Sequence, residues 1–409
     1  MIVLVVNCGS SSVKLQLIQT DAERQRLDQD LRLARCHAER VGGDTHITCE
    51  AAGHAPVVWD SPSADHGTAL ATLLDWLVTA GVEGIRSLAD IHAVGHRVVH
   101  GGERFTSSVR IEAEVLEAIE ACADLAPLHN PANLAGIRAT RDLLGPQVPQ
   151  VAVFDTAFHS NMPERARVYG IPYELSRRHR IQRYGFHGTS HRYVTSRYAA
   201  WCRIPRQDVH AISLHLGNGC SACAVRAGAS VDTSMGFTPL EGLLMGTRAG
   251  DLDASLLHFL SDKEGMSLQE LDFMLNERSG LLGLSGTTGD MRDLLAAAAR
   301  QDPRASLAID VFCYRVRKYI GAYYAALEGA SVVLFTGGIG ENSPEIRQRI
   351  ATGLECIGLR LDSKQNDACV GGVQGAISSP DASLAAWVIP TDEERMIAHD
   401  VYASVGGAS

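Results

Sequence analysis

The strongest constraint on the fold is a pair of similar segments, one near the start of the chain and one past its middle. Residues 3–17 read VLVVNCGSSSVKLQL, and residues 212–225 read ISLHLGNGCSACAV. In each segment a polar, glycine-containing turn separates two strand-like runs, which predicts a β-hairpin. Gly9 and Gly219 let backbone amides approach an anion closely, and Lys14 adds a positive charge. Two such hairpins predict a duplicated α/β protein that holds a polyphosphate between its halves.

A Walker-type phosphate loop is the obvious alternative, and the sequence excludes it. That loop requires the pattern GxxxxGK[ST] between a strand and a helix. Here Lys14 is followed by Leu15, Gln16 and Leu17, whose period of two continues a strand instead of opening a helix. The arrangement is similar to that of the actin, hexokinase and Hsp70 type of ATPase. An ordinary serine-rich turn stays open as the interpretation of the first hairpin taken alone.

Length and charge narrow the class of protein. A chain of 409 residues is long enough for two domains with ample cores. Its net charge is −10 at pH 7 and no basic block occurs, so nucleic acid is not an expected partner. No stretch approaches the roughly 18 apolar residues of a membrane span. The apolar start lacks the basic residues of a signal peptide, so we expect a cytoplasmic protein that binds no membrane.

The cysteines also fit a cytoplasmic protein. Ten are scattered along the chain, and Cys220 and Cys223 form its one CxxC pair. On a strand, residues three apart point to opposite faces of the sheet. We therefore interpret these two as small buried residues, and not as a redox pair or half of a zinc site.

Strand-like runs alternate with helical patterns throughout the chain. Periodicity predicts helices at 64–80, 113–123 and 303–327, and buried strands at 150–154 and 331–335. Near the end, a strand at 386–389 precedes a predicted capping box of Thr391 with Glu394, which would start a final helix. We expect that helix to return to the first domain. The predicted domains are residues 1–155 with about 391–409, and residues 156–390.

Further segments carry residues that suit phosphoryl transfer, at 96–102, 153–159, 184–191, 245–253, 335–344 and 390–394. In the segment at 184–191, Thr189 or Ser190 is expected to cap a helix that follows His187. In the segment at 335–344, a glycine turn is expected before a helix that is capped by Ser343 and begins with Pro344. Together with NCGSSSVK at 7–14 and GFHGTSH at 185–191, these segments resemble the acetate kinase family, in order along the whole chain. That family belongs to the acetate and sugar kinase, Hsp70 and actin superfamily. The resemblance implies an α/β, duplicated, actin-like and ribonuclease H-like two-domain kinase fold with an interdomain cleft. Ala249 stands where many members have serine.

The resemblance also implies an activity. The expected reaction is reversible, magnesium-dependent transfer of a phosphoryl group from ATP to acetate, directly and in line, giving acetyl phosphate and ADP. Mn²⁺ is an alternative ion, and a homodimer is the implied assembly. A propionate kinase or another short-chain acyl kinase is the alternative on the same scaffold. A non-metabolic ATPase of the actin or Hsp70 type is the alternative from another class, and it would need no pair of arginines to hold a carboxylate.

Four residues match the catalytic positions of the family: Arg97, Asp155, His187 and Arg248. Arginine offers planar, bidentate donors to a carboxylate or a phosphoryl group. A carboxylate nucleophile is already ionised, so we expect Asp155 to position groups through water, metal or arginine, and not to accept a proton. His187 is implied to donate to the transferring phosphoryl group. Surface ion pairs, a strand-end cap and a core histidine are the structural alternatives for these residues.

The remaining family positions define three expected subsites. The substrate pocket is implied at Arg97, Val99, Leu128, Phe186 and Pro239. Asn7 and Glu393 match the positions closest to the metal, although an acid in a first helical turn also suits the helix dipole. The implied nucleotide contacts are Ser10, Ser12, Lys14, His215, Leu216, Gly217, Asn218, Gly219, Asp290, Met291, Arg292, Gly338, Ile339, Gly340, Glu341 and Asn342.

Overall fold

The computed structural model describes residues 1–62, 65–126 and 129–406, and the chain divides into two compact units. The first unit comprises Met1–Ser160 and the segment that begins at Asp392, and the second comprises Asn161–Thr391. The sequence placed the first boundary at Asp155, a few residues earlier. Within the described residues, no helix is long and apolar enough to cross a membrane.

The first unit is built on an eight-stranded sheet in the order β5-β4-β3-β2-β1-β6-β8-β7. Strands β1 to β5 form an antiparallel meander, while β6 pairs with β1 and β8 in parallel. The predicted first hairpin and the predicted strand at 150–154 are both confirmed. The strands are β1 (Ile2–Cys8), β2 (Ser12–Gln19), β3 (Leu31–Glu39), β4 (Asp44–Ala51), β5 (Val57–Pro62), β6 (Ala93–Val98), β7 (Val109–Arg110) and β8 (Gln150–Phe154).

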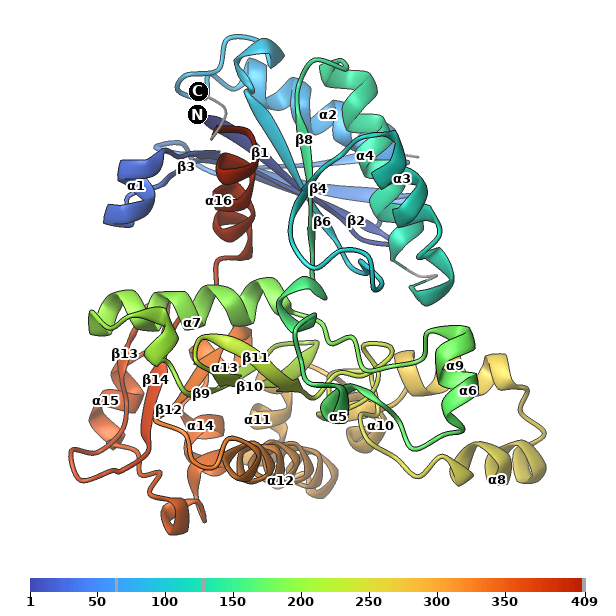
Figure 1. The fold of residues 1–409 in the computed structure, drawn as a ribbon, viewed down its shortest axis with the longest axis vertical. Coiled ribbons are helices and arrows are strands. Elements are labelled where there is room, and N and C mark those ends of the chain that lie inside the picture. Colours follow the sequence, from blue (N-terminus) through green and yellow to red (C-terminus); the bar gives the residue numbers. More distant parts are fainter. Residues whose placement is uncertain (63–64, 127–128, 407–409) are drawn as a thin grey trace. The chain divides into compact units, whose positions relative to one another are not determined.

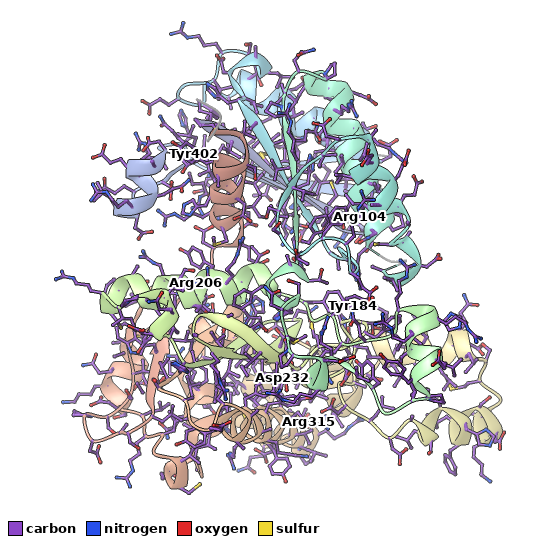
Figure 2. All side chains as sticks on the ribbon, viewed as in Figure 1. Arg104, Tyr184, Arg206, Asp232, Arg315 and Tyr402 are labelled. Atoms are coloured by element: carbon purple, nitrogen blue, oxygen red, sulfur yellow. A yellow bond between two sulfur atoms is a disulfide. The ribbon has the colours of Figure 1, made fainter. Side chains whose placement is uncertain are left out.

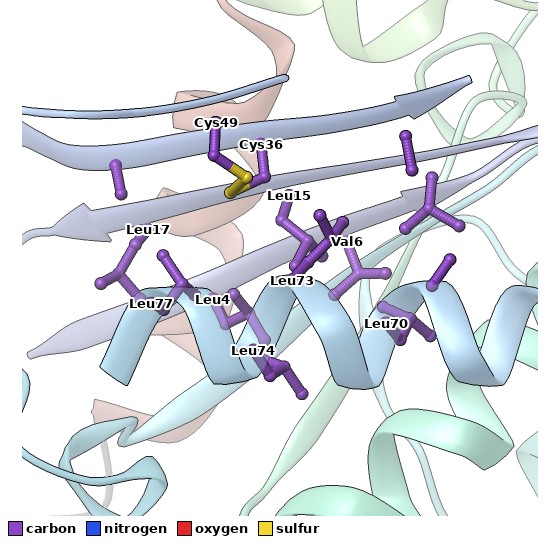
Figure 3. Packing of buried hydrophobic residues seen from close by; sticks show 14 of the residues in the cluster. Leu4, Val6, Leu15, Leu17, Cys36, Cys49, Leu70, Leu73, Leu74 and Leu77 are labelled. Carbon is purple, nitrogen blue, oxygen red and sulfur yellow. A yellow bond between two sulfur atoms is a disulfide. The ribbon is translucent and has the colours of Figure 1, made fainter. Parts of the chain in front are cut away.

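Helices cover both faces of this sheet, because alternate residues of the buried strands point in opposite directions. Leu4 and Val6 pack with the leucines of α2 (His66–Thr79), as Figure 3 shows. Val3 and Val5 face α16 (Glu393–Val405) on the other side. Burying each such side chain contributes about 1.5–3 kcal/mol. The other helices are α1 (Ala22–Leu27), α3 (Ala113–Glu120) and α4 (Asn130–Leu144).

The second unit has a six-stranded sheet in the order β11-β10-β9-β12-β14-β13. The predicted second hairpin is confirmed as β9 and β10, and β12 pairs in parallel with β9 and β14. Helices α7 (Gly188–Cys202) and α12 (Pro303–Ala326) lie on opposite faces of the sheet (Figure 1). The strands are β9 (Ala211–Leu216), β10 (Cys220–Arg226), β11 (Ala229–Thr233), β12 (Val332–Thr336), β13 (Gly375–Ala376) and β14 (Ala385–Val388).

Short helices make up much of the rest of the second unit and carry several of the predicted site segments. They are α5 (Glu164–Arg167), α6 (Tyr173–His179), α8 (Ser255–Glu264), α9 (Leu268–Glu277), α10 (Gly280–Ser285), α11 (Met291–Ala299), α13 (Gly337–Asn342), α14 (Pro344–Ala351) and α15 (Ser363–Ala368). The three predicted helices are confirmed as α2, α3 and α12, with ends that differ by a few residues. Residue 64, the predicted start of the first, lies outside the described residues.

The predicted capping box at the last helix is wrong. The N-cap of α16 is Asp392, whose carboxylate accepts a hydrogen bond from the Arg395 amide at 3.0 Å. The Thr391 hydroxyl lies 2.8 Å from the Ser190 hydroxyl instead. Aspartate is at least as good a cap as threonine. Because the Thr391 side chain already has a partner within the second unit, Asp392 takes the cap and Glu394 has no capping-box role.

Two other helix starts differ from the prediction. Residues 337–342 form helix α13 instead of a glycine turn, although Ser343 does cap α14 and Pro344 follows it as expected. Helix α7 is not capped by Thr189 or Ser190, because His187 occupies the N-cap position in the left-handed conformation, with φ of 55°. Both differences bear on the candidate active site.

The cysteines divide into two groups. Cys220 and Cys223 are buried and free, and burial raises the pKa of each thiol to about 12, which agrees with the expected structural role. Cys36 and Cys49 lie opposite each other in the β3–β4 register and form a disulfide that was not predicted (Figure 3). Disulfides are rare in cytoplasmic proteins, so the cytoplasmic location stays a prediction.

Candidate active site

Arg97 and Asp155 form a bidentate ion pair in the first unit. Arg97 lies on β6 and Asp155 directly follows β8, and these strands are parallel neighbours. Arg97 Nε donates to Asp155 Oδ1 at 3.0 Å, and Nη2 donates to Oδ2 at 2.6 Å. The Asp155 side chain is 1% exposed and that of Arg97 is 23% exposed. The pair is therefore a buried one that leaves part of the guanidinium open, and not a surface ion pair.

Glu393 approaches the same arginine from the start of α16. Its Oε2 lies 3.9 Å from Arg97 Nε. Burial raises the pKa of Glu393 well above its usual range. The positive charge of Arg97 lowers this pKa, and the negative charge of Asp155 raises it further. A cation bound nearby would favour the ionised carboxylate. The position of Glu393 thus suits a group that faces a positively charged ligand.

The oxygen donors in this region fit a magnesium ion. Glu393 and Asp155 both contact Arg97, and Asn7 lies at the end of β1, opposite Lys14 in the hairpin register. Mg²⁺ prefers hard oxygen ligands and keeps several waters. Among the residues that the structure describes, no group of three or more His, Cys, Asp or Glu could enclose a metal.

The first hairpin turn is shaped by a residue far away in the sequence. Gly9 N donates to Ser12 O at 2.8 Å, and the Gly9 carbonyl lies 2.7 Å from His66 Nε2 at the start of α2. Ser10 and Lys14 are exposed and Ser12 is half-buried. Their side chains are therefore accessible to a phosphate group. Sequence inspection missed His66, since nothing in its neighbourhood links it to the turn.

Two asparagines of α4 fix the backbone that follows Arg97. Asn133 donates to Cys8 O at 2.7 Å and accepts from the Val99 amide at 3.0 Å, which joins β1 to the strand beside it. Asn130 makes a pair of hydrogen bonds, each 3.1 Å long, with the backbone of His100. Both asparagines are buried. They were not predicted, although two asparagines spaced by three lie on the buried face of one helix, which is a usable signal.

In the second unit, His187 and Arg248 meet at the turn of the second hairpin. A methyl group built on Gly219 would lie 3.4 Å from His187 Nε2 and 3.8 Å from Arg248 Nη1. The ring centroids of His187 and His215 are 4.3 Å apart. The glycine therefore leaves room between two donors where a side chain would stand. This is the arrangement expected for close approach of a phosphoryl group.

His187 adopts a backbone conformation that few side chains tolerate. Its φ of 55° lies in the left-handed region, which is uncommon outside glycine and is concentrated at functional sites. Gly185, two residues before it, also has a positive φ, of 77°, which glycine adopts without strain. Phe186 beside it is buried.

Arg248 lies on a loop that also carries Pro239. Its Nη1 donates to the Pro239 carbonyl at 3.3 Å. The carboxylate of Glu241 on this loop accepts hydrogen bonds from Arg183 and from the Tyr169 hydroxyl. The part of the loop that precedes Arg248 is therefore held by half-buried partners.

Asp232 on β11, labelled in Figure 2, adds a third charged group that interacts with Arg183 and Glu241. Burial raises the pKa of Asp232, while Arg183 lowers it. Arg183 also donates to the carbonyls of Thr233 and Ser234, each at 3.1 Å. One arginine thus ties the end of β11 to the loop that presents Arg248.

A cavity of about 690 Å³ lies in the second unit beside the Gly219 turn. Its volume falls within the range of about 300–1,000 Å³ that is typical of small-ligand sites. Eight predicted nucleotide residues line it: Gly217, Asn218, Asp290, Met291, Arg292, Gly338, Ile339 and Asn342. Four further lining residues were missed: Thr247, Gly289, Leu295 and Ser343.

Some predicted nucleotide residues lie next to the cavity without lining it. They are His215, Leu216, Gly219, Gly340 and Glu341. The Glu341 carboxylate accepts from the amides of Gly337 at 2.8 Å and Thr391 at 3.0 Å, so it is turned into the protein. A role of Glu341 toward a nucleotide would therefore be to hold α13 in place. Leu128, predicted in the acyl pocket, lies outside the described residues.

The two sheets, the paired phosphate-type hairpins and the cavity define a phosphotransferase with the two-domain actin-like fold. Residues 2–399 match the model of the acetokinase family, and the chain belongs to that family. The family resemblance and the fold class expected from the sequence are both confirmed.

Relatives at high identity cover the chain from end to end. The acetate kinase of Solibacter usitatus is 55% identical over 99% of this chain and 98% of its own, and that of Chloroherpeton thalassium is 51% identical over 98% and 99%. The crystal structure of Porphyromonas gingivalis acetate kinase matches with a TM-score of 0.92 and 41% identity, covering 99% of each chain. A propionate kinase from Francisella tularensis matches with a TM-score of 0.91 and 42% identity, over 99% of this chain and 100% of that one.

Proposed function

We propose that this protein transfers a phosphoryl group reversibly between ATP and acetate, giving acetyl phosphate and ADP. Membership of the acetokinase family supports the reaction class. The observation that carries the proposal is the meeting of His187 and Arg248 at the Gly219 turn, beside a nucleotide-sized cavity.

The chemistry asks the protein mainly for positioning and for stabilisation of negative charge. An ionised acetate oxygen attacks the γ-phosphorus in line while the bond to the ADP oxygen breaks, so no general base is needed. His187 and Arg248 donate to the oxygens of the transferring group. Arg97 offers the open part of its guanidinium to anionic substrate, and Asp155 keeps that guanidinium oriented.

Magnesium is the proposed cofactor, with manganese as an alternative. When bound, the ion would neutralise phosphate charge. Asn7 and Glu393 are the residues proposed to hold it, through water. The two carboxylates near Arg97 support this assignment.

Acetate is the proposed acid, and propionate is the second candidate. Val99, Phe186 and Pro239, with Leu128, are proposed to bound the methyl group. The similarity to the Francisella tularensis propionate kinase supports propionate as the second candidate. One methylene is worth only about 1–3 kcal/mol in such a pocket, so both acids should react to different extents.

A hydroxamate assay tests the reaction and its acid together. The purified protein with ATP and Mg²⁺ should form acyl phosphate from acetate, less from propionate and least from butyrate. A faster reaction with propionate would favour the second candidate. ATP hydrolysis without any acyl phosphate would overturn the proposal and favour an ATPase of the actin or Hsp70 type.

A homodimer in the cytoplasm is the proposed assembly and location. Large exposed apolar side chains gather on two segments of the second unit: Val168, Ile171, Tyr173 and Leu175, and Leu256, Phe259, Leu268 and Phe273. Figure 1 shows α6, α8 and α9 at one end of that unit. Exposed apolar surface of this kind is typical of protein interfaces. Light scattering during gel filtration should give twice the chain mass, and a monomer would contradict the assembly.

A further inference from the structure

A chain of buried hydrogen bonds runs from the sheet of the second unit to His187. Ser213 Oγ lies 2.8 Å from His191 Nδ1, and His191 Nε2 lies 2.8 Å from Ser221 Oγ. Ser221 Oγ in turn lies 3.0 Å from His187 Nδ1. Ser213, Ser221 and His191 are each 0% exposed. The chain therefore ends at His187 and has no solvent-exposed member between Ser213 and Ser221.

The secondary structure explains why these residues meet. His187 and His191 are four apart, so they lie on the same side of the α7 start. Ser213 on β9 and Ser221 on β10 come from the sheet face that α7 covers, since Ser221 pairs with His215 and Ser190 of α7 reaches His215 at 2.8 Å. A buried polar side chain is costly unless it is hydrogen-bonded. A chain of four mutually bonded polar groups avoids that cost.

Counting donors and acceptors shows in which direction each hydrogen bond of this series is donated. For His187 to donate from Nε2 as a neutral ring, its Nδ1 must accept a proton from the Ser221 hydroxyl. Ser221 Oγ must then accept from His191 Nε2–H, and His191 Nδ1 must accept from the Ser213 hydroxyl. In a doubly protonated His187, Nδ1–H would donate to Ser221 Oγ, which reverses that bond. The doubly protonated ring would also place a second positive charge beside Arg248, with which it shares the Gly219 turn.

We propose that His191 and Ser221 are positioning residues that hold His187 as the neutral tautomer with its Nε2–H aimed at the Gly219 turn. The inference rests on the proposed role of His187 toward the phosphoryl group. Neither positioning residue touches substrate. Because the hydroxyl and both rings are already hydrogen-bonded before the reaction, the donor does not have to reorient as charge develops.

Single-hydroxyl deletions provide the test, because they leave little empty space in the core. Ser221→Ala should lower kcat roughly 10- to 100-fold, as expected for a misaligned donor, with KM for ATP and acetate changed less than about threefold. Ser230→Ala is the matched control, since Ser230 is also a fully buried serine of the same sheet and accepts a hydrogen bond from Cys223 Sγ at 3.3 Å. It should retain the kcat of the parent.

Ser213 and Ser221 should act together, because both belong to the same series of hydrogen bonds. Ser213→Ala should lower kcat in the same direction, and the Ser213→Ala, Ser221→Ala double variant should be no slower than Ser221→Ala alone. Nitrogen-15 NMR of the histidine rings should show the Nε2–H tautomer of His187 in the parent and a tautomer mixture in Ser221→Ala. A kcat of Ser221→Ala within about twofold of the parent, or an unchanged tautomer, would overturn the proposal.

His187→Ala separates this inference from the proposed function. If His187→Ala loses turnover while Ser221→Ala keeps it, the positioning role fails and the role of His187 stands. If His187→Ala itself keeps turnover, the phosphoryl-donor role fails, and the inference that depends on it fails too.

Discussion

At the scale of single residues, each of the proposed donors is held by partners within its own unit. Arg97 is bonded by a buried carboxylate, and Arg248 is held to the Pro239 carbonyl on a braced loop. His187 is fixed by its left-handed backbone and by Ser221. Preorganised donors of this kind stabilise developing charge without a reorganisation cost.

Replacing Arg248 by alanine should reduce turnover far more than stability. Loss of one charged donor typically lowers kcat about 10²–10³-fold. The exposed ion pair of Arg360 with Asp381 offers a control, and Arg360→Ala should change kcat less than about twofold. Steady-state kinetics with thermal melting of both variants makes the comparison, and near-parental turnover in Arg248→Ala would remove it from the site.

Replacing Val99 by alanine should change the choice of acid. Val99 is buried and its amide is fixed by Asn133, so the smaller side chain should leave space in place instead of letting the backbone shift. The extra methylene of propionate can fill that space for about 0.8 kcal/mol. The propionate-to-acetate ratio of kcat/KM should rise several-fold, up to about tenfold. A flat ratio would show that Val99 does not line the acyl pocket.

At the scale of elements, helix α13 is held at its end by a buried arginine. Arg347 of α14 is 0% exposed, and its guanidinium donates to the carbonyls of Gly340 at 2.8 Å and Glu341 at 3.0 Å. The same group donates to Asn366 of α15, at 2.7 Å to the side chain. One side chain thus positions the helix whose Gly338 and Ile339 line the cavity.

Arg347→Lys should therefore loosen α13. Lysine cannot reproduce the planar fork of donors, and carbonyls left without partners cost about 1–3 kcal/mol each. We expect a KM for ATP raised several-fold and a lower melting temperature. Arg349→Lys is the matched control two residues away, because Arg349 makes exposed ion pairs with Glu345 and Asp310. Equal effects in the two variants would contradict the positioning of α13 by Arg347.

At the scale of the whole molecule, the proposed site residues are divided between two compact units, each built on one sheet. The first unit carries Arg97, Asp155 and Glu393, and the second carries His187, Arg248 and the cavity. We propose that these units are the two domains expected from the sequence. The end of the chain joins the first unit because one face of α16 packs on the strands near the start.

The stability of the first unit should fall in mild acid. His96 is buried with its Nε2 2.9 Å from Gln150 Oε1, and burial lowers the pKa of His96 from 6.5 to about 4. Between these values the unfolded chain binds the proton and the folded one does not, so stability rises with pH. As the pH falls through this range, the free energy of unfolding should decrease by up to about 3 kcal/mol.

Urea unfolding at pH 7 and pH 5 measures this dependence. His96→Gln should reduce this dependence and not remove it, because burial also lowers the pKa of His100 in the same unit to about 4. His258→Gln, at a histidine whose side chain is 85% exposed, should leave the dependence as in the parent. An unchanged pH dependence in His96→Gln would contradict the assignment.

The sequence alone determined the local features of this protein. Period-two alternation and glycine turns gave both hairpins, and a continuous three-and-four periodicity gave α12 within a residue or so at each end. Short motifs also identified the family and most of the cavity lining. These signals are local because backbone conformation and turn chemistry depend on residues within a few positions of one another.

Only the tertiary structure decided which distant residues support the site. His66 at the Gly9 turn, Asn133 between β1 and Val99, and Ser221 at His187 are each far in sequence from the group they hold. The capping prediction failed for the same reason, since the Thr391 hydroxyl was already bonded to Ser190. A buried hydrogen bond is chosen by which faces pack together, and that packing is a property of the folded chain as a whole.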